Sequence, residues 1–515
     1  MSAIETAVQK EPPSLAPDLS DCRCIRCEAG ALAMNEPIDP ARVQPGALGC
    51  GACGARYDVI HGVPYLLALE ESDFVALVEI AGEYDSPSYE LGQFKPMDDS
   101  WPRTLAACKE ASDYEAFKAS LAPGYAAGLD DRYDQYRMLD VLTGEMDLRG
   151  KKVLVVGAGL GFDTNLLMYR GARCTAVDLN PQTNTIGAIQ TPRARWIGAL
   201  GRRLPFIDAA FDHVFISASL HHVLDVSATI VEMLRVLKPG GSLVTTNDSH
   251  SADATSDLED ARFWNDHQDV LRGINENTPR LKVYIDPILE RIDDLDVDFW
   301  THRAFGLWVE EENARKNLLE PRRWDLKRDH VRLRETGGGI FMRVTPRKQI
   351  ANPLPPPGPS VVTPAELFSF VGRKREAMAC IARLAPAHLV SPLFPGPAGN
   401  TKFQLLNGWR WTEPGEQGRD AYLCGRWYVR RDKRQKKLVV EVFPKRIGAP
   451  DPEVTVAVDG AVKKAFRVAR GSRKKVVVDI ADTPVDRPMA LEVSMSPPGE
   501  GLEQRLLRVM RLDVM

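Results

Sequence analysis

Five of the nine cysteines in this 515-residue chain fall between positions 22 and 53. Four of them form two pairs with two residues between the partners, Cys24 with Cys27 and Cys50 with Cys53, and 22 residues separate the pairs. Two such turns place four thiolates at the corners of a tetrahedron, which predicts a structural zinc site in a zinc ribbon. Such a site has no open position for catalysis, so we expect a structural or docking role. Cys22 is left over and could substitute for Cys24.

A glycine-rich segment is the second place where residue types suggest chemistry. The stretch KKVLVVGAGLGFD puts three glycines after an apolar run, where glycine permits tight turns and close approach to a ligand. Asp178 ends the next apolar run, 21 residues after Gly157, the spacing at which a carboxylate meets ribose hydroxyls in nucleotide-binding α/β folds. The glycine spacing is GxGxG, whereas the dinucleotide fingerprint is GxGxxG or GxGxxA. The sequence therefore favours a nucleotide-type ligand other than NAD.

The elements that must position these residues follow from the alternation along the chain. Apolar runs that read VLVVG, CTAVD, FDHVFISA and GSLVTTN are separated by helix-length stretches. That rhythm predicts βαβ units and a parallel sheet, in which loops at the carboxyl edge bind the ligand. We therefore expect an α/β, Rossmann-like domain.

Four motifs in this region resemble, in order and spacing, the class I S-adenosylmethionine-dependent methyltransferase family of type 11. They are Leu204-Pro205-Phe206, the strand start Phe211-Asp212, the pair His221-His222, and RVLKPGG from Arg235 to Gly241. The segment GGGIFMRVTP is similar to the last strand of the family. The resemblance covers residues 151–347 and implies S-adenosylmethionine as the cofactor.

The resemblance also implies which residues bind that cofactor: Gly157, Ala158, Gly159, Gly161, Asp178 and Leu179. The glycine loop would cradle the methionine part, Asp178 would bind the ribose hydroxyls, and Leu179 would lie against adenine. Two acids of the family are missing, because Val155 stands two residues before the first glycine and no Asp stands at Ala199 or Leu200. Their loss could mean weaker cofactor binding or a domain kept for another purpose.

Histidines after the fourth and fifth strands are the candidates for catalysis, because transfer to a hydroxyl requires removal of its proton. The candidates are His222, His221 and His250. Asp248 lies close to His250 in the sequence, but two ligands are too few to indicate a metal ion. A later loop, RGINENTPRLKVY, is similar to an insertion that would present Asn275 and Glu276 to the acceptor.

Two flanking regions also resemble known modules. The segment CGACGARYDVIHGVPYLL is similar to small zinc ribbons that accompany methyltransferases, with Tyr57 and Ile60 before the turn Gly62-Val63-Pro64. Near the C-terminus, GWRWTEPGEQGRDAYLCGRWYVR resembles β-sandwich modules attached to glycan-modifying enzymes. Its tryptophans at 409, 411 and 427 could stack on sugar rings, although tryptophans in a sandwich are more often core residues.

Composition shifts divide the chain into six segments. A proline-rich joint separates the α/β domain from later short alternating strands, which predict an antiparallel sandwich of roughly seven strands. The predicted segments are a disordered leader at 1–20, the zinc ribbon at 21–70, a helical linker region at 71–148, the class I methyltransferase domain at 149–350, the proline-rich joint and helix at 351–395, and the β-sandwich at 396–515.

Bulk properties exclude several functional classes. The apolar share of 44 % and charged share of 26 % are typical of globular proteins, and neither a membrane span nor a secretion signal is visible, so we expect a cytoplasmic protein. A net charge of −4 argues against nonspecific binding of nucleic acid.

Three functional hypotheses remain open. The leading one is O-methylation of a sugar in a cell-surface glycan or its precursor, so the expected partner is a small-molecule or glycan acceptor. A second is an RNA or protein methyltransferase that uses the zinc ribbon for substrate docking. The third is a non-catalytic assembly subunit with a degenerate methyltransferase fold, whose ribbon or sandwich binds a protein partner.

Overall fold

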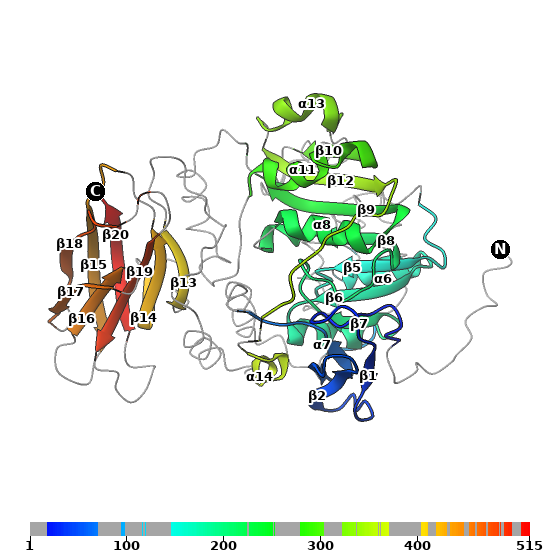
Figure 1. The fold of residues 1–515 in the computed structure, drawn as a ribbon, viewed down its shortest axis with the longest axis horizontal. Coiled ribbons are helices and arrows are strands. Elements are labelled where there is room, and N and C mark those ends of the chain that lie inside the picture. The colour runs from blue at the N-terminus through cyan, green and yellow to red at the C-terminus, as the bar shows by residue number, and fades with distance from the viewer. Residues whose placement is uncertain are drawn as a thin grey trace.

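The computed structural model contains two β-sheets, one of twelve strands in the N-terminal two thirds of the chain and one of eight near the C-terminus (Figure 1). The structure describes residues 18–70, 94–97, 116, 119, 146–223, 226–250, 252, 279–302, 322–335, 337–358, 360, 362–369, 403–409, 419–429, 433–446, 453–458, 461–469, 472–483, 485, 489–496 and 506–515. Within these residues no helix is long and apolar enough to cross a membrane.

Five parallel strands form the centre of the larger sheet. In spatial order they are β7 (Arg195–Gly198), β6 (Arg173–Asp178), β5 (Lys152–Val156), β8 (Phe211–Ser217) and β9 (Leu237–His250). The edge beyond β9 is made by three further strands: β12 (Gly338–Pro346), β10 (Leu295–His302) and β11 (Arg322–Trp324). Strand β12 runs antiparallel to both of its neighbours. The predicted Rossmann-like sheet is confirmed, and the segment that resembled the family's last strand forms the antiparallel strand β12.

Helices connect the strands and bury apolar faces against them. They are α6 (Phe162–Tyr169), α7 (Pro181–Gln190), α8 (Val226–Val236), α11 (Leu281–Leu289) and α13 (Leu326–Leu333), with single turns η3 (Leu220–His222) and η4 (Ile292–Asp294). Helix α7 begins where Asn180 accepts hydrogen bonds from the next turn and Pro181 occupies the first helical position, a favourable start for a helix. Helix α8 buries Ile230 and Leu234 completely and contacts α11.

The cysteine-rich region extends the same sheet. Its strands are β1 (Leu32–Met34), β2 (Val43–Cys50), β3 (Arg56–Ile60) and β4 (Val63–Tyr65), joined as antiparallel neighbours. Strand β4 then pairs in parallel with β7 through Tyr65 and Gly198, and Leu66 N donates to Gly198 O at 2.9 Å. One hydrophobic core includes Leu48 and Tyr57 from this region together with Ile197 from β7. The two regions therefore fold as one packed body.

Packing of the Tyr65 side chain over Gly198 and an ion pair between Arg195 and Asp21 connect the cysteine-rich region to the rest of the sheet. A Cβ at Gly198 would overlap the Tyr65 ring, so the absence of a side chain makes room for the tyrosine. The Tyr65 hydroxyl donates to Pro181 O at 3.1 Å. On the other flank Arg195 donates to buried Asp21 at 2.5 Å. These contacts join residues more than a hundred positions apart.

The proline-rich stretch after β12 runs back along the domain toward the cysteine-rich region. Five of its hydrogen bonds are Gln349 Nε2 to Arg235 O, Asn352 Nδ2 to Glu232 Oε2, Arg203 Nη2 to Pro355 O, Leu69 N to Ser360 Oγ and Ala365 N to Asp58 Oδ2, at 2.5 to 2.9 Å. Helix α14 (Pro364–Phe368) ends it, with a capping box between Thr363 and Glu366. We call the described residues between 347 and 369 the strap, because their hydrogen bonds connect α8 with β3.

The C-terminal sheet is antiparallel throughout. Its strands are β13 (Phe403–Trp409), β14 (Arg419–Val429), β15 (Lys437–Arg446), β16 (Glu453–Val458), β17 (Ala461–Arg467), β18 (Lys474–Asp479), β19 (Met489–Ser496) and β20 (Leu506–Val514). They follow the order β17-β16-β19-β14-β20-β15-β18, and β13 pairs with β14. Alternating valines of β15 and β16 are buried in a core of their own. The described residues of this region form eight strands where roughly seven were expected, and the two-layer arrangement stays a prediction.

Several predictions concern residues outside the described part of the chain. These are the leader up to residue 17, nearly all of the helical linker region at 71–148, the loop with Asn275 and Glu276, most of the joint beyond 369, and Trp411. The side chains of Trp409 and Trp427 are likewise outside it.

Candidate functional site

The glycine loop begins where β5 ends. Gly157, Gly159 and Gly161 all have left-handed backbone, with φ of 62°, 52° and 89°. A Cβ at Gly157 would lie 2.6 Å from the Oγ atom of Ser219, which follows β8. At Gly157 a side chain is therefore excluded both by backbone conformation and by space, and the loop presents its backbone at the carboxyl edge of the sheet.

Asp178 is tied to this loop at the end of β6. One carboxylate oxygen, Oδ2, accepts a hydrogen bond from Gly159 N at 2.9 Å, and the other accepts from Asn180 N at 3.0 Å. Ala158 N donates to Val177 O at 3.0 Å, which holds the loop against the strand. Leu179 follows as a half-buried side chain. The structure thus brings together the six residues expected to bind the cofactor, and their binding role stays a prediction.

The two positions that lack the family's acids are apolar and buried. Val155 is 2 % exposed within β5, between Ala176 of β6 and Phe215 of β8. Leu200 is 8 % exposed in a tight turn in which Arg203 N donates to its carbonyl at 3.0 Å. Both side chains pack into the domain, so neither position offers a carboxylate to a ligand.

The three candidate histidines occupy different environments near the ends of β8 and β9. His221 lies in η3, where its Nδ1 is 2.9 Å from Asp248 Oδ1, and its backbone N–H donates to the same oxygen at 3.1 Å. The His222 ring lies against it, with 4.2 Å between ring centroids. His250 is 3 % exposed at the end of β9. Sequence proximity linked Asp248 with His250, whereas the structure pairs Asp248 with His221, 27 residues away.

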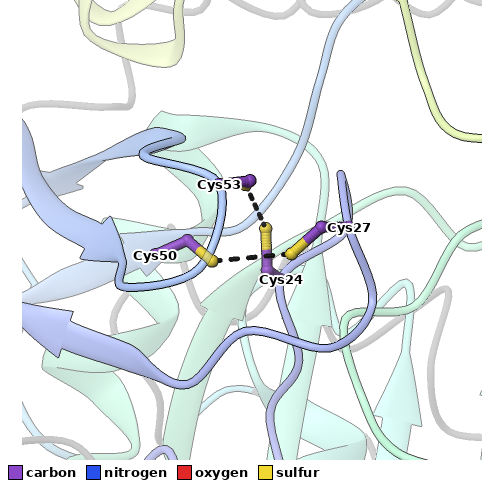
Figure 2. Close-up of side chains that lie close together, drawn as sticks. All are labelled: Cys24, Cys27, Cys50 and Cys53. Carbon is purple, nitrogen blue, oxygen red and sulfur yellow. Dashed lines mark hydrogen bonds between the residues drawn. The ribbon is translucent and has the colours of Figure 1, made fainter.

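The four paired cysteines converge from two places, since Cys24 and Cys27 lie in the loop before β1, and Cys50 and Cys53 lie at the end of β2 and in the turn after it (Figure 2). Their sulfur atoms all lie within 4.8 Å of one another, with 3.7 Å between Cys24 and Cys53 and 3.6 Å between Cys27 and Cys50. A tetrahedral zinc ion with bonds of about 2.3 Å to sulfur requires sulfur separations of about 3.8 Å. The arrangement of donors therefore fits the expected zinc ion.

Neighbouring groups shape the chemistry of these thiols. Burial opposes ionisation of Cys50, but the backbone N–H groups of Cys53 and Ala52 and the nearby thiols outweigh it and lower its pKa to about 7. The Tyr57 hydroxyl lies 3.0 Å from Cys24 Sγ, and burial followed by this contact raises the tyrosine pKa. A thiolate at Cys24 would accept a hydrogen bond from this hydroxyl.

Cys22 lies apart from the cluster. It pairs with Phe206 in an isolated β-bridge, its side chain is buried, and burial raises the pKa of its thiol to about 12. Its sulfur is not one of the four that lie within 4.8 Å of one another. The structure thus favours Cys24 over Cys22 as the first ligand.

Part of the chain that contains this site matches a known protein family. Residues 154–245 match the family model described as a methyltransferase domain. Within these residues the chain is similar to methyltransferase domains. The match begins in β5 and ends in β9, so it includes the glycine loop, Asp178 and the His221-His222 pair.

Curated relatives match over a similar length. The demethylmenaquinone methyltransferase of Mycolicibacterium paratuberculosis is 39 % identical over 105 residues, which is 20 % of this chain and 45 % of the relative. That of Corynebacterium urealyticum is 41 % identical over 110 residues, 21 % of this chain and 43 % of the relative. The chain thus spans less than half the length of these relatives.

A solved structure, phosphoethanolamine N-methyltransferase 2 of Haemonchus contortus with S-adenosyl-L-methionine, matches at 15 % identity and a TM-score of 0.29. The match covers 41 % of this chain and 52 % of that one.

Proposed function

We propose that this protein is an S-adenosylmethionine-dependent methyltransferase. The hydrogen bond from Gly159 N to Asp178 Oδ2 carries the proposal, because it fixes a carboxylate beside a left-handed glycine loop in a methyltransferase domain. When bound, S-adenosylmethionine supplies a methyl group on a positively charged sulfur. The loop backbone would hold its methionine part, Asp178 would accept hydrogen bonds from the ribose hydroxyls, and Leu179 would lie against adenine.

Titration calorimetry with S-adenosylmethionine and S-adenosylhomocysteine tests this proposal. We expect both to bind, Asp178→Ala to weaken binding by about 1.5–3 kcal/mol through loss of a charge-assisted hydrogen bond, and NADH not to compete. Asp293→Ala is the matched control, since Asp293 is an exposed carboxylate paired with Lys327. A folded chain that gives no heat with either compound would favour the non-catalytic assembly subunit.

We further propose that Cys24, Cys27, Cys50 and Cys53 hold one structural zinc ion. The four sulfurs support this by their spacing, and the shared core supports a role in holding the cofactor domain rather than in catalysis. A closed four-thiolate site leaves no ligand position for a substrate.

For the acceptor we propose a sugar hydroxyl of a cell-surface glycan or its precursor. Support comes from the sequence near Trp409, which resembles β-sandwich modules of glycan-modifying enzymes. A second candidate is a quinone-type acceptor, favoured by the relatives named demethylmenaquinone methyltransferase. Transfer of radiolabelled methyl from S-adenosylmethionine to glycoside and quinol acceptors separates the two.

A further inference from the structure

His221 and Asp248 are held together more firmly than a surface ion pair would be. Oδ1 of Asp248 lies 2.9 Å from Nδ1 of His221 and accepts a hydrogen bond from the backbone N–H of the same histidine at 3.1 Å. The side chains are 11 % and 1 % exposed, so the contact is shielded from water. A buried carboxylate in this geometry fixes both the position of the ring and its rotation.

The backbone around the pair is strained. Ala218, at the end of β8, and Asn247, in β9, both have left-handed backbone, with φ of 47° and 61°. The pairing of β9 with β12 shifts register next to Asn247, which indicates a bulge that re-aims the following residue, Asp248. Ala218 N donates to Thr246 O at 2.8 Å, so the two strained segments support each other. Such strain concentrates where side chains must be aimed for function.

The pair also lies beside the loop proposed to hold the cofactor. Ser219 Oγ donates to Ser217 O at 2.8 Å and lies 3.3 Å from Gly157 O. His221 is two residues farther along the same short segment, in η3. The turn that carries the histidine is therefore fastened directly to the first glycine of the loop.

From these contacts we propose that His221 is the general base of the methyl transfer, that Asp248 is its positioning residue, and that the acceptor is a hydroxyl group. This inference rests on the proposed methyltransferase function. Because Asp248 accepts from Nδ1, the neutral ring carries its proton there and has its lone pair on Nε2, on the opposite edge.

The chemistry balances as follows. The acceptor hydroxyl gives its proton to Nε2 of His221, and its oxygen forms a bond to the methyl carbon. The bond between that carbon and sulfur breaks, and its electron pair stays on sulfur, which becomes neutral. The Asp248 carboxylate stabilises the imidazolium that forms. A hydroxyl needs such a base at neutral pH, whereas a neutral amine can attack through its own lone pair.

The tautomer of His221 provides a test that does not depend on turnover. We would label the nine histidines with ¹⁵N in an otherwise deuterated chain bound to S-adenosylhomocysteine, and assign His221 through His221→Gln. We expect the proton on Nδ1, and a shift toward the Nε2–H tautomer in Asp248→Asn with unchanged S-adenosylhomocysteine affinity. A wild-type His221 protonated on Nε2 would overturn the positioning role, even if Asp248→Asn failed to fold.

Turnover tests the base and the acceptor class. The probes are methyl glycosides of hexoses and 6-deoxyhexoses, with S-adenosylhomocysteine as the product measured. In His221→Gln we expect kcat to fall about 10²- to 10⁴-fold, with little change in KM for S-adenosylmethionine. His330→Gln, on the exposed face of α13, is the matched control and should retain the wild-type rate.

Two results would overturn the proposal. One is methylation of a hydroxyl probe at an unchanged rate in His221→Gln. The other is transfer to an amine probe such as ethanolamine phosphate with no transfer to any hydroxyl probe. Either result leaves the methyltransferase function standing, whereas failure of the wild-type chain to bind S-adenosylhomocysteine removes that function itself.

Discussion

The cysteine-rich region and the C-terminal sheet both flank the α/β domain, but they relate to it differently. Strand β4 continues the domain's sheet, and residues such as Leu48 belong to the core that also contains Ile197. The buried residues described in the C-terminal sheet form a second core, drawn from residues 438–493 alone. Both flanking regions look like separate modules in the sequence. The cysteine-rich region becomes part of the α/β domain because its strands extend the domain's sheet, whereas the C-terminal sheet has a core of its own.

Loss of the proposed zinc ion should produce the largest effect, because the ion would stabilise a region that shares a hydrophobic core with the α/β domain. In small zinc domains the apparent binding free energy is about 10 kcal/mol or more. We expect Cys50→Ser with Cys53→Ser to abolish zinc content by elemental analysis and to lower the thermal midpoint of the methyltransferase domain. Cys22→Ala should keep its zinc. Unchanged zinc content in the double variant would refute the assignment of these cysteines as zinc ligands. An unchanged thermal midpoint would show that zinc binding does not stabilise the α/β domain.

Two matched leucine substitutions test the separation of the cores. Leu48 is fully buried in the first core and Leu491 is 1 % exposed in the second, so replacing either with alanine should cost about 2–5 kcal/mol. Leu48→Ala should lower S-adenosylmethionine binding and shift the domain's unfolding, while Leu491→Ala should shift a different calorimetric transition and leave binding unchanged. A single transition moved equally by both variants would show that the cores unfold together.

The junction itself can be tested through a steric clash. Gly198→Val should destabilise the protein by about 3 kcal/mol, since its side chain would overlap the Tyr65 ring. Tyr65→Ala in the same chain should recover part of the loss, and a double-mutant cycle in urea measures the coupling. Gly337→Ala is the control, because the nearest atom to its Cβ would be 3.6 Å away. If the free-energy changes of the two substitutions were additive, the packing of Tyr65 against Gly198 would not contribute to the pairing of β4 with β7.

Truncation of the strap should also destabilise the protein. A chain ending at Pro355 loses the hydrogen bonds that Leu69 N donates to Ser360 Oγ and Ala365 N donates to Asp58 Oδ2, together with the burial of Leu367, which should cost about 3 kcal/mol. A chain ending at residue 370 keeps them and should match the full chain in S-adenosylmethionine affinity. Thermal unfolding of the two truncated chains measures the difference. Equal thermal midpoints would show that residues 356–369 of the strap add nothing to the stability of the α/β domain.

Local signals account for most of what could be predicted. The parallel strands followed from apolar runs separated by helix-length stretches, and the glycine loop followed from residues whose left-handed backbone favours glycine. The meeting of Asp178 with Gly159 was foreseeable, because parallel neighbouring strands bring their carboxyl ends to one edge. The clustering of four thiols followed from two short turns of known geometry.

Contacts between distant segments decided the rest. The sequence by itself determined the glycine loop, the cysteine pairs and the alternation of strands, since each depends on sterics and periodicity within a few neighbouring residues. Only the tertiary structure determined that β4 pairs with β7, that Ala365 of the strap donates to Asp58, and that Asp248 pairs with His221 instead of nearby His250. Such pairings depend on complementary shapes, such as the space that Gly198 leaves for Tyr65, and these exist only once both segments are in place.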